Sequence, residues 1–239
     1  MSLKAVNIVW LKRDLRSQDH APLLKAECAG VPYRIIYLFE PSRIEYPDTG
    51  PRHLQFVYHS ISTLDKVLSE FNRRVELFYG EAIKVFNYLI KDLDIISIFS
   101  YQESGTQGSW VRDKKIKQFC KSNQINWKES QRDGILRGIK NREDWNKKWH
   151  LKMHTPVIQN KYTISKETRL EHTFQIPSIL ESQLKEYPNH YQPPGEKNAW
   201  RYLKSFTNQR GFNYQRHISK PMEAECLVVV YLLIWHGET

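Results

Sequence analysis

Cysteines, long apolar runs and export signals are scarce or absent in this sequence, and each absence excludes a class of protein. The 239 residues include three cysteines, Cys28, Cys120 and Cys226, which are far apart and lack metal-ligand spacing. This pattern predicts reduced core thiols in a cytoplasmic protein and no disulfide framework. The apolar run at 6–11 is too short for a signal peptide. The run at 227–235 falls short of the roughly 20 residues that span a bilayer, so no membrane association is expected.

The common nucleotide-binding motifs are also missing. The chain contains neither GxGxxG nor GxxxxGK[ST], which excludes a dinucleotide fingerprint and a P-loop. Acidic residues are fewer than basic ones, 26 against 36, and the formal net charge is +10. This charge favours anionic partners such as nucleic acids or nucleotides, although many basic enzymes share it.

Short apolar runs alternate along the chain with segments of helical period. They predict strands at residues 5–11, 33–39, 75–79, 95–101 and 125–129, and helices at residues 21–29, 52–71, 81–91 and 109–122. Near-continuous apolar runs are typical of strands covered on both faces. We therefore predict an α/β fold with a doubly wound, five-stranded parallel sheet of the Rossmann-like kind. Ligands of such sheets lie beyond the carboxyl ends of the strands, which directs attention to the loops at 12–20 and 102–107.

The composition changes after residue 130. Residues 131–160 are basic and aromatic, whereas residues 163–192 are polar, lack a clear period and lead into Pro193-Pro194-Gly195. Helical period resumes at Glu196, with Gly211 as the expected stop. We expect an α/β domain at residues 1–160, an interdomain linker at 161–194 and the start of an all-α domain at 195–239.

The stretch Trp10-Leu-Lys-Arg-Asp-Leu-Arg16, followed by Asp19 and His20, resembles the opening of DNA photolyases and cryptochromes. In that family a first strand runs into a W-x-[KR]-x-D-L-R loop. From their chemistry, Arg13 and Asp14 are expected to brace neighbouring loops through charge-assisted hydrogen bonds. Direct contact of these two residues with a cofactor is the alternative.

A second similarity to this family begins at Tyr101-Gln102-Glu103 and continues at Trp110 and Arg112. The resemblance implies that Glu103, with Gln102 beside it, helps to hold a folate-type antenna pigment in members that use one. A carboxylate in this loop can accept hydrogen bonds from the amino and ring N–H groups of a pterin. The alternative is that Glu103 stabilises the N-terminus of the next helix. Because family members differ in pigment, the expected antenna chromophore is of the folate or the deazaflavin type.

A third similarity covers residues 195–221, which resemble the start of the family's helical flavin domain. By that match Tyr214 corresponds to a tyrosine that contacts the flavin nucleotide, and the alternative is an ordinary, partly buried aromatic residue. The resemblance implies FAD as cofactor, DNA as partner of the full-length protein, and light-driven repair of pyrimidine dimers by electron transfer from reduced FAD. A cryptochrome photoreceptor without repair is the first alternative. A nucleotide-binding module of the electron-transfer-flavoprotein type is the second.

The last residues depart from the family pattern. After Lys220-Pro221 the family has a motif similar to CSRLSPYLAWGN, whereas residues 226–239 read CLVVVYLLIWHGET. Codons chosen to encode the family motif, when read one base later, encode the sequence at 228–239. This match suggests a frameshift. We therefore expect a truncated helical domain, an incomplete FAD site and a chain that is inactive alone.

Basic side chains between Arg132 and Lys152 suggest a separate nucleic-acid site, whose phosphate contacts would weaken steeply with salt. We favour a solvated loop that packs on the helical domain, because Trp145, Trp149 and Met153 need burial. Nucleic-acid binding by this chain alone is therefore not expected.

Overall fold

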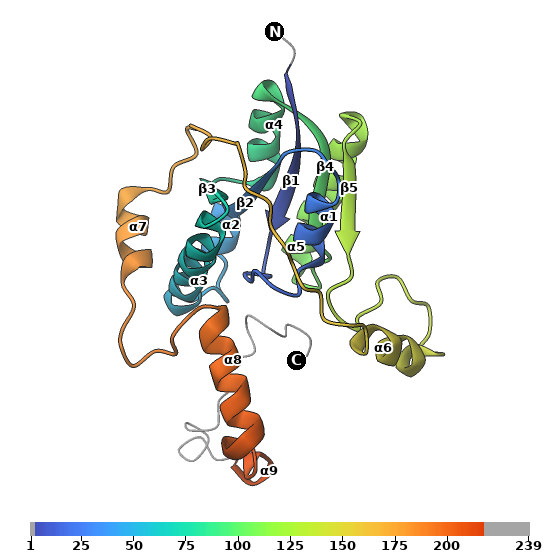
Figure 1. The fold of residues 1–239 in the computed structure, drawn as a ribbon, viewed down its shortest axis with the longest axis vertical. Coiled ribbons are helices and arrows are strands. Elements are labelled where there is room, and N and C mark those ends of the chain that lie inside the picture. The colour runs from blue at the N-terminus through green and yellow to red at the C-terminus, as the bar shows by residue number, and fades with distance from the viewer. Residues whose placement is uncertain (1–2, 218–239) are drawn as a thin grey trace.

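Five parallel strands form one sheet, and their order sets the position of the candidate site (Figure 1). A computed structural model describes residues 3–217. The strands lie in the order β3-β2-β1-β4-β5, and their bounds are β1 Lys4–Leu11, β2 Tyr33–Phe39, β3 Val75–Tyr79, β4 Leu93–Tyr101 and β5 Asn126–Ser130. The chain order reverses between β1 and β4. This arrangement confirms the predicted doubly wound α/β fold.

Helices cover both faces of the sheet. The first face carries α1 (Ala21–Glu27) and α3 (Pro51–Ser69), and the second carries α4 (Ala82–Asp92) and α5 (Gln107–Ser122). Successive side chains of a strand point to opposite faces. Val9 and Leu11 of β1 therefore pack on the first face, and Ile8 and Trp10 pack on the second. Because both faces are covered, this strand is apolar at nearly every position.

Proline marks the start of the three helices that lie nearest the N-terminus. Pro22 lies in the first turn of α1, Pro41 opens the short α2 (Pro41–Ile44), and Pro51 opens α3. Proline suits the first turn because its missing N–H has no acceptor within the helix there. His20 caps α1 by accepting a hydrogen bond at Nδ1 from the Leu23 N–H, at 3.2 Å. These signals place α2 and α3 directly after β2, beside the edge where the strands end.

Residues 163–177, which we call the strap, run along the outer edge of β3. The Tyr79 N–H donates to the Phe174 carbonyl at 2.9 Å, and Arg34 Nη1 donates to the Thr168 carbonyl at 3.0 Å. Phe174 also packs against the apolar core. A covered edge strand cannot pair with another chain. The strap is thus fixed to the sheet along part of the segment that composition alone predicts to be an interdomain linker.

Helices α7, α8 and α9 and a short π-helix follow the strap in the chain. The predicted helix at Glu196 is confirmed as α8 (Glu196–Ser205), which continues as a π-helix (Phe206–Arg210) and leads to α9 (Tyr214–His217). The helical run stops at Gly211 as expected, although that residue has a φ of −78° and not the left-handed conformation of many glycine caps. Composition did not predict α7 (Ser178–Lys185), which packs on α3 through the buried Leu184.

Helix α6 (Trp145–Met153) was also not predicted, and it extends from the body of the molecule (Figure 1). None of its residues is buried, so the expected burial of Trp145, Trp149 and Met153 is only partial. The two indoles lie beside each other with ring centroids 6.4 Å apart. They partly cover one another, and Lys147 and Lys148 of α6 are exposed to solvent.

Two of the three cysteines lie in the described part of the chain, and they differ in burial. Cys120 is buried as predicted, but Cys28 is exposed, so the expectation of a core thiol is wrong at that position. Residues 218–239, which include Cys226 and the residues on which the frameshift hypothesis depends, lie outside the described part of the chain. Among residues 3–217, no helix is both long enough and apolar enough to cross a membrane.

Candidate functional site

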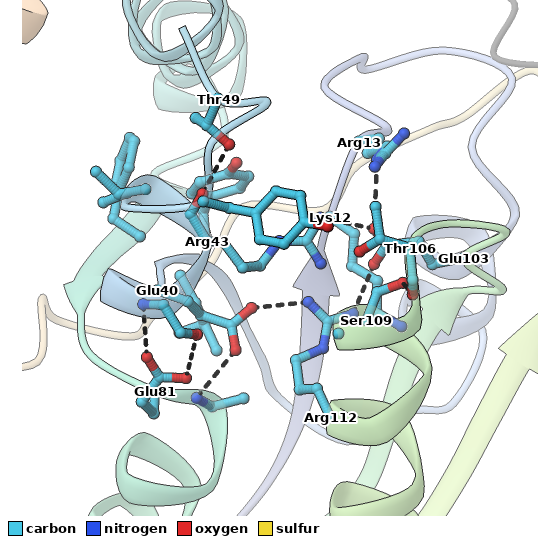
Figure 2. A pocket seen from close by; sticks show the side chains of 18 of the residues that line it. Lys12, Arg13, Glu40, Arg43, Thr49, Glu81, Glu103, Thr106, Ser109 and Arg112 are labelled. Atoms are coloured by element: carbon cyan, nitrogen blue, oxygen red, sulfur yellow. Dashed lines mark hydrogen bonds and ion pairs between the residues drawn. The ribbon is translucent and has the colours of Figure 1, made fainter. Parts of the chain in front are cut away.

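A cavity of about 880 Å³ opens over the carboxyl ends of β1, β2 and β4. It lies beside the reversal of strand order, where doubly wound sheets hold their ligands. Its wall includes residues 10–13 and 37–40 at the strand ends and residues 106–109 at the start of α5. Figure 2 shows several of the polar side chains that meet in it. The volume falls within the roughly 300–1,000 Å³ of small-molecule sites.

One part of the wall is aromatic and aliphatic. Trp10 and Tyr37 come from the adjacent strands β1 and β2, and Phe39 follows on β2. Leu54 and Val57 of α3 complete this apolar part. Flat rings together with branched aliphatic side chains form a surface that suits a planar heteroaromatic molecule.

The polar part of the lining is built around one buried carboxylate, Glu103 (Figure 2). Its Oε1 pairs with Arg13 Nε at 3.3 Å and with Arg43 Nη2 at 3.1 Å, and its Oε2 pairs with Arg112 Nη2 at 2.5 Å. Its side chain is 2% exposed. Burial by itself would raise the pKa of Glu103, but Arg112 and Arg43 outweigh it and hold the pKa well below the usual range. Glu103 thereby joins the loops that follow β1, β2 and β4.

A second carboxylate, Glu40, links the same arginine to helix α4. It accepts a hydrogen bond from Arg112 Nη1 at 2.7 Å and one from the Ala82 N–H at 3.3 Å. Burial raises the pKa of Glu40 even though Arg112 opposes that shift. Nearby, Glu81 accepts hydrogen bonds from the backbone N–H and the hydroxyl of Ser42 (Figure 2). These contacts fix α2 against the start of α4.

Lys12 lies at the inner end of the cavity with its side chain 4% exposed. Its Nζ pairs with Asp113 Oδ2 at 3.0 Å and lies 4.6 Å from the centroid of Trp10 and 5.2 Å from that of Trp127. The Arg112 guanidinium carbon is 4.9 Å from the centroid of Trp10. Burial lowers the pKa of Lys12, and Asp113 counteracts this shift.

The structure separates the predicted site residues into two groups. Arg13 and Glu103 line the cavity and meet each other there. Asp14 is buried outside the lining, where it pairs with His20 Nε2 at 2.6 Å and accepts the Lys12 N–H at 3.1 Å. Gln102 is also outside the lining, and its N–H donates to the Ser130 carbonyl at 2.8 Å. The predicted bracing of neighbouring loops is observed for Arg13 but not for Asp14, whose partners lie within its own loop. Contact of any of these residues with a cofactor stays a prediction.

Tyr214 is far from this group of residues. It lies on α9, beyond the end of α8 that is remote from the sheet (Figure 1), and its ring contacts Phe206 at 5.6 Å. The residue is 43% exposed and does not line the cavity. Tyr214 and Glu103 consequently cannot belong to one binding site, and the flavin contact of Tyr214 stays a prediction.

Sequence reasoning missed Glu40 and Arg43 as members of the site. Both follow β2 directly, so the rule that ligands sit at strand ends would have found them had it been applied to this strand as well. Lys12 lies in the motif that we singled out. Nothing in the sequence indicates, however, that its side chain points inward between two indoles.

Comparisons with known proteins agree with this arrangement. A model of the DNA photolyase family matches residues 7–160. The cryptochrome DASH of Synechocystis sp. is 24% identical over 116 residues, which are 46% of this chain and 24% of that protein. The chain therefore spans about a quarter of the length of this curated relative.

Two solved structures share the fold. One is an archaeal photolyase from Sulfolobus tokodaii, described as containing two FAD molecules with the implication of a novel light-harvesting cofactor. It aligns with a TM-score of 0.64 at 20% identity, over 89% of this chain and 48% of its own. The other is a cryptochrome of Synechocystis sp., with a TM-score of 0.69 at 18% identity, over 96% of this chain and 54% of its own.

Proposed function

The chain belongs to the DNA photolyase family, and from that premise we propose that its α/β half holds a planar antenna pigment in the cavity at the carboxyl edge of the sheet. One observation carries the proposal: a cavity of about 880 Å³ is lined by aromatic side chains and by arginines held by Glu103. Folate, deazaflavin and flavin pigments all combine flat rings with carbonyl or anionic groups. Such a molecule matches both parts of the lining.

The residues present fit a pigment of this kind. Arg43 Nη1 is buried and has no hydrogen-bond partner among the described residues, so it offers a donor to a ligand oxygen. The Arg13 side chain is 38% exposed and lies at the same wall. Glu103 would orient these guanidinium groups rather than contact the pigment, because both of its oxygens already pair with arginine. A bound pigment would supply the absorption of near-ultraviolet or blue light.

We propose light-dependent repair of pyrimidine dimers as the activity of the whole protein, with reduced FAD as electron donor and DNA as partner. The family match and the likeness to a solved photolyase support this assignment. A blue-light photoreceptor is the second candidate, because the Synechocystis relative is a cryptochrome. The free thiols of Cys28 and Cys120 support a reducing compartment, and we propose the cytoplasm.

Ligand titration of the purified protein tests the antenna proposal. We expect FMN, a methenyl folate or a deazaflavin to bind with a rise in fluorescence anisotropy. Gly108→Leu should abolish that binding. Gly108 lines the cavity, and a β-carbon at this position would lie 3.7 Å from its nearest neighbour, Thr106 Oγ1, so the protein can accept the new side chain while the cavity loses space.

Lys114→Met on the outer side of α5 is the control for this titration, because Lys114 does not line the cavity. Binding to none of the three pigments, or equal binding by Gly108→Leu, would refute the proposal.

A genetic assay separates repair from sensing in the whole protein. Expression in cells that lack photorepair should raise survival after ultraviolet irradiation only when visible light follows. Equal survival in light and darkness would contradict the repair activity and leave the photoreceptor as the favoured function.

A further inference from the structure

Trp10, which lines the cavity, lies next to Trp127, which is not part of the lining, and cations lie over both rings. The two indole centroids are 6.0 Å apart. Lys12 Nζ lies over both rings, and Arg112 lies over Trp10 as well. Pigment binding as such does not require buried cations on indole faces. Their placement therefore calls for a separate explanation.

The chemistry of an excited pigment suggests one. Excited flavins, deazaflavins and pterins are strong one-electron oxidants, and indole is the most easily oxidised ring among the common side chains. Trp10 lines the cavity, so an occupant would lie beside it. One electron would leave the Trp10 indole, which becomes a radical cation, and the excited pigment would gain that electron. No bond breaks and no proton moves, but the excitation is lost before it can be passed on.

We propose that Lys12 and Arg112 suppress this electron transfer by destabilising a radical cation on Trp10. The inference rests on the proposed function of the cavity and adds a role for residues that need not touch the pigment. A positive charge on the indole would lie about 5 Å from each of two fixed positive charges, and like charges at this distance repel strongly away from water. Neutral indole, in contrast, attracts a cation over its face.

Burial strengthens the repulsion between these cations and a radical cation on Trp10. The side chains of Lys12 and Arg112 are 4% and 12% exposed, so solvent screens their charges poorly. Asp113 pairs with both cations, at 3.0 Å from Lys12 Nζ and 2.8 Å from Arg112 Nη2, and Glu103 and Glu40 pair with Arg112 at 2.5 and 2.7 Å. These carboxylates hold the cations in place and reduce part of the repulsion. The groups that lie over the indole face are nevertheless the cations.

Helix α5 provides a matched control outside the cavity. Lys114 Nζ lies 4.0 Å from the centroid of Trp110, which is a similar contact between a lysine and an indole. Trp110 is 54% exposed, and neither of these residues lines the cavity. Loss of the Lys114 charge should therefore not affect a pigment in the cavity.

The first test measures the fluorescence lifetime of FMN bound to the protein. Lys12→Met should shorten the lifetime by roughly tenfold, since a change of one nearby charge is large enough to change an electron-transfer rate by that factor. Lys12→Arg should keep the wild-type lifetime, Lys114→Met should do the same, and Trp10→Phe combined with Lys12→Met should restore it. An unchanged lifetime in Lys12→Met, or no restoration in the double variant, would overturn the inference.

The second test needs no pigment and separates this inference from the antenna proposal. Pulse radiolysis with azide radicals oxidises tryptophans in the free protein, and the resulting indole radicals are followed by their visible absorption. We expect Trp10→Phe to lower the radical yield in the Lys12→Met background but not in the wild type. Equal effects in both backgrounds would overturn the inference, whether or not the cavity binds FMN. Failure of FMN to bind, together with the expected radical yields, would count against the antenna proposal alone.

Discussion

Several buried ionisable side chains pair with another buried polar or charged side chain. Asp14 and His20 are both almost fully buried and lie 2.6 Å apart. Arg34 and Glu76 form a similar pair at 2.6 Å between β2 and β3. Removal of one partner from such a pair is strongly destabilising, because the remaining group keeps its cost of desolvation.

The Asp14 pair gives a first prediction. Asp14→Ala should lower the free energy of unfolding by about 3 kcal/mol, since His20 Nε2 and the Lys12 N–H lose their acceptor. Urea denaturation measures the change. Asp94→Asn, at an exposed position of β4, is the control and should change it by less than about 0.5 kcal/mol. Similar losses in the two variants would contradict the structural role of Asp14.

Low pH should weaken the contact between Asp14 and His20. Burial works to raise the pKa of Asp14, but the hydrogen bond with His20 lowers it below the ordinary value of 3.8. A carboxyl group with a lowered pKa in the folded state contributes stability above its ordinary pKa, and that stability is lost as the pH falls through the folded-state pKa. The difference in free energy of unfolding between wild type and Asp14→Ala should therefore become smaller when urea denaturation is repeated in this acidic range.

Glu103 gives a second prediction at the scale of one side chain. Glu103→Gln should destabilise the fold by about 2 kcal/mol and weaken FMN binding, because three guanidinium groups lose the charge that holds them together. Glu129→Gln is the matched control, since that carboxylate pairs with Arg137 in a partly exposed position and should contribute under about 1 kcal/mol. Unchanged FMN affinity in Glu103→Gln would show that the arginines hold their positions without it.

At the scale of whole elements, the strap should respond to pH through His172. Its ring stacks on Phe78 with centroids 4.0 Å apart, and its Nδ1 is buried without a hydrogen-bond partner among the described residues. Burial, with a contribution from Arg169, lowers the pKa of His172 below 6.5. The unfolded chain therefore takes up the proton first as the pH falls, and the folded state loses stability.

We accordingly expect the urea midpoint to decrease as the pH falls from about 7 toward 5, and His172→Phe to reduce that decrease. His190→Phe, in an exposed position, serves as the control and should leave the pH dependence unchanged. Identical pH profiles for wild type and His172→Phe would show that the strap does not respond to this residue.

The elements also show which patterns in a sequence predict structure. The bounds of β2 and β3 agree with prediction because buried parallel strands are short, continuous apolar runs. Helices α6 and α7 were missed because α6 buries none of its residues and α7 buries only Leu184. Their position depends on contacts with distant residues, which periodicity within the segment does not record.

Prediction of the candidate site from the sequence is limited in the same way, because side-chain directions depend on contacts that the sequence does not record. Arg13 and Glu103 could be predicted to meet because they follow β1 and β4, which flank the reversal of strand order. Asp14, next to Arg13 in the chain, points into the protein instead of the cavity. The direction of a side chain in a loop follows from the local backbone and its buried hydrogen bonds, so sequence spacing alone could not separate these two neighbours.

At the scale of the whole molecule, the net charge of +10 is partly neutralised at the cavity and remains exposed around α6. Arginines at the cavity pair with Glu40, Glu103 and Asp113, whereas no ion pair is formed by Lys147 or Lys148 among the described residues. We expect no retention of duplex DNA on a filter at about 200 mM salt, because any non-specific phosphate contacts formed at about 50 mM salt are lost by then. Retention at the higher salt that is lost in Lys147→Gln/Lys148→Gln would instead establish a specific site on α6.

The loop between β1 and α1 holds two parts of the molecule at once. Arg13 meets Glu103 at the cavity, while Ser17 donates from its N–H and its hydroxyl to Glu196 at the start of α8, at 2.8 and 2.7 Å. A chimera that takes the segment from α8 onward from a relative would separate Ser17 from its acceptor if the junction followed the strap. Residues 12–20 and the start of α8 should therefore come from the same parent in a working chimera.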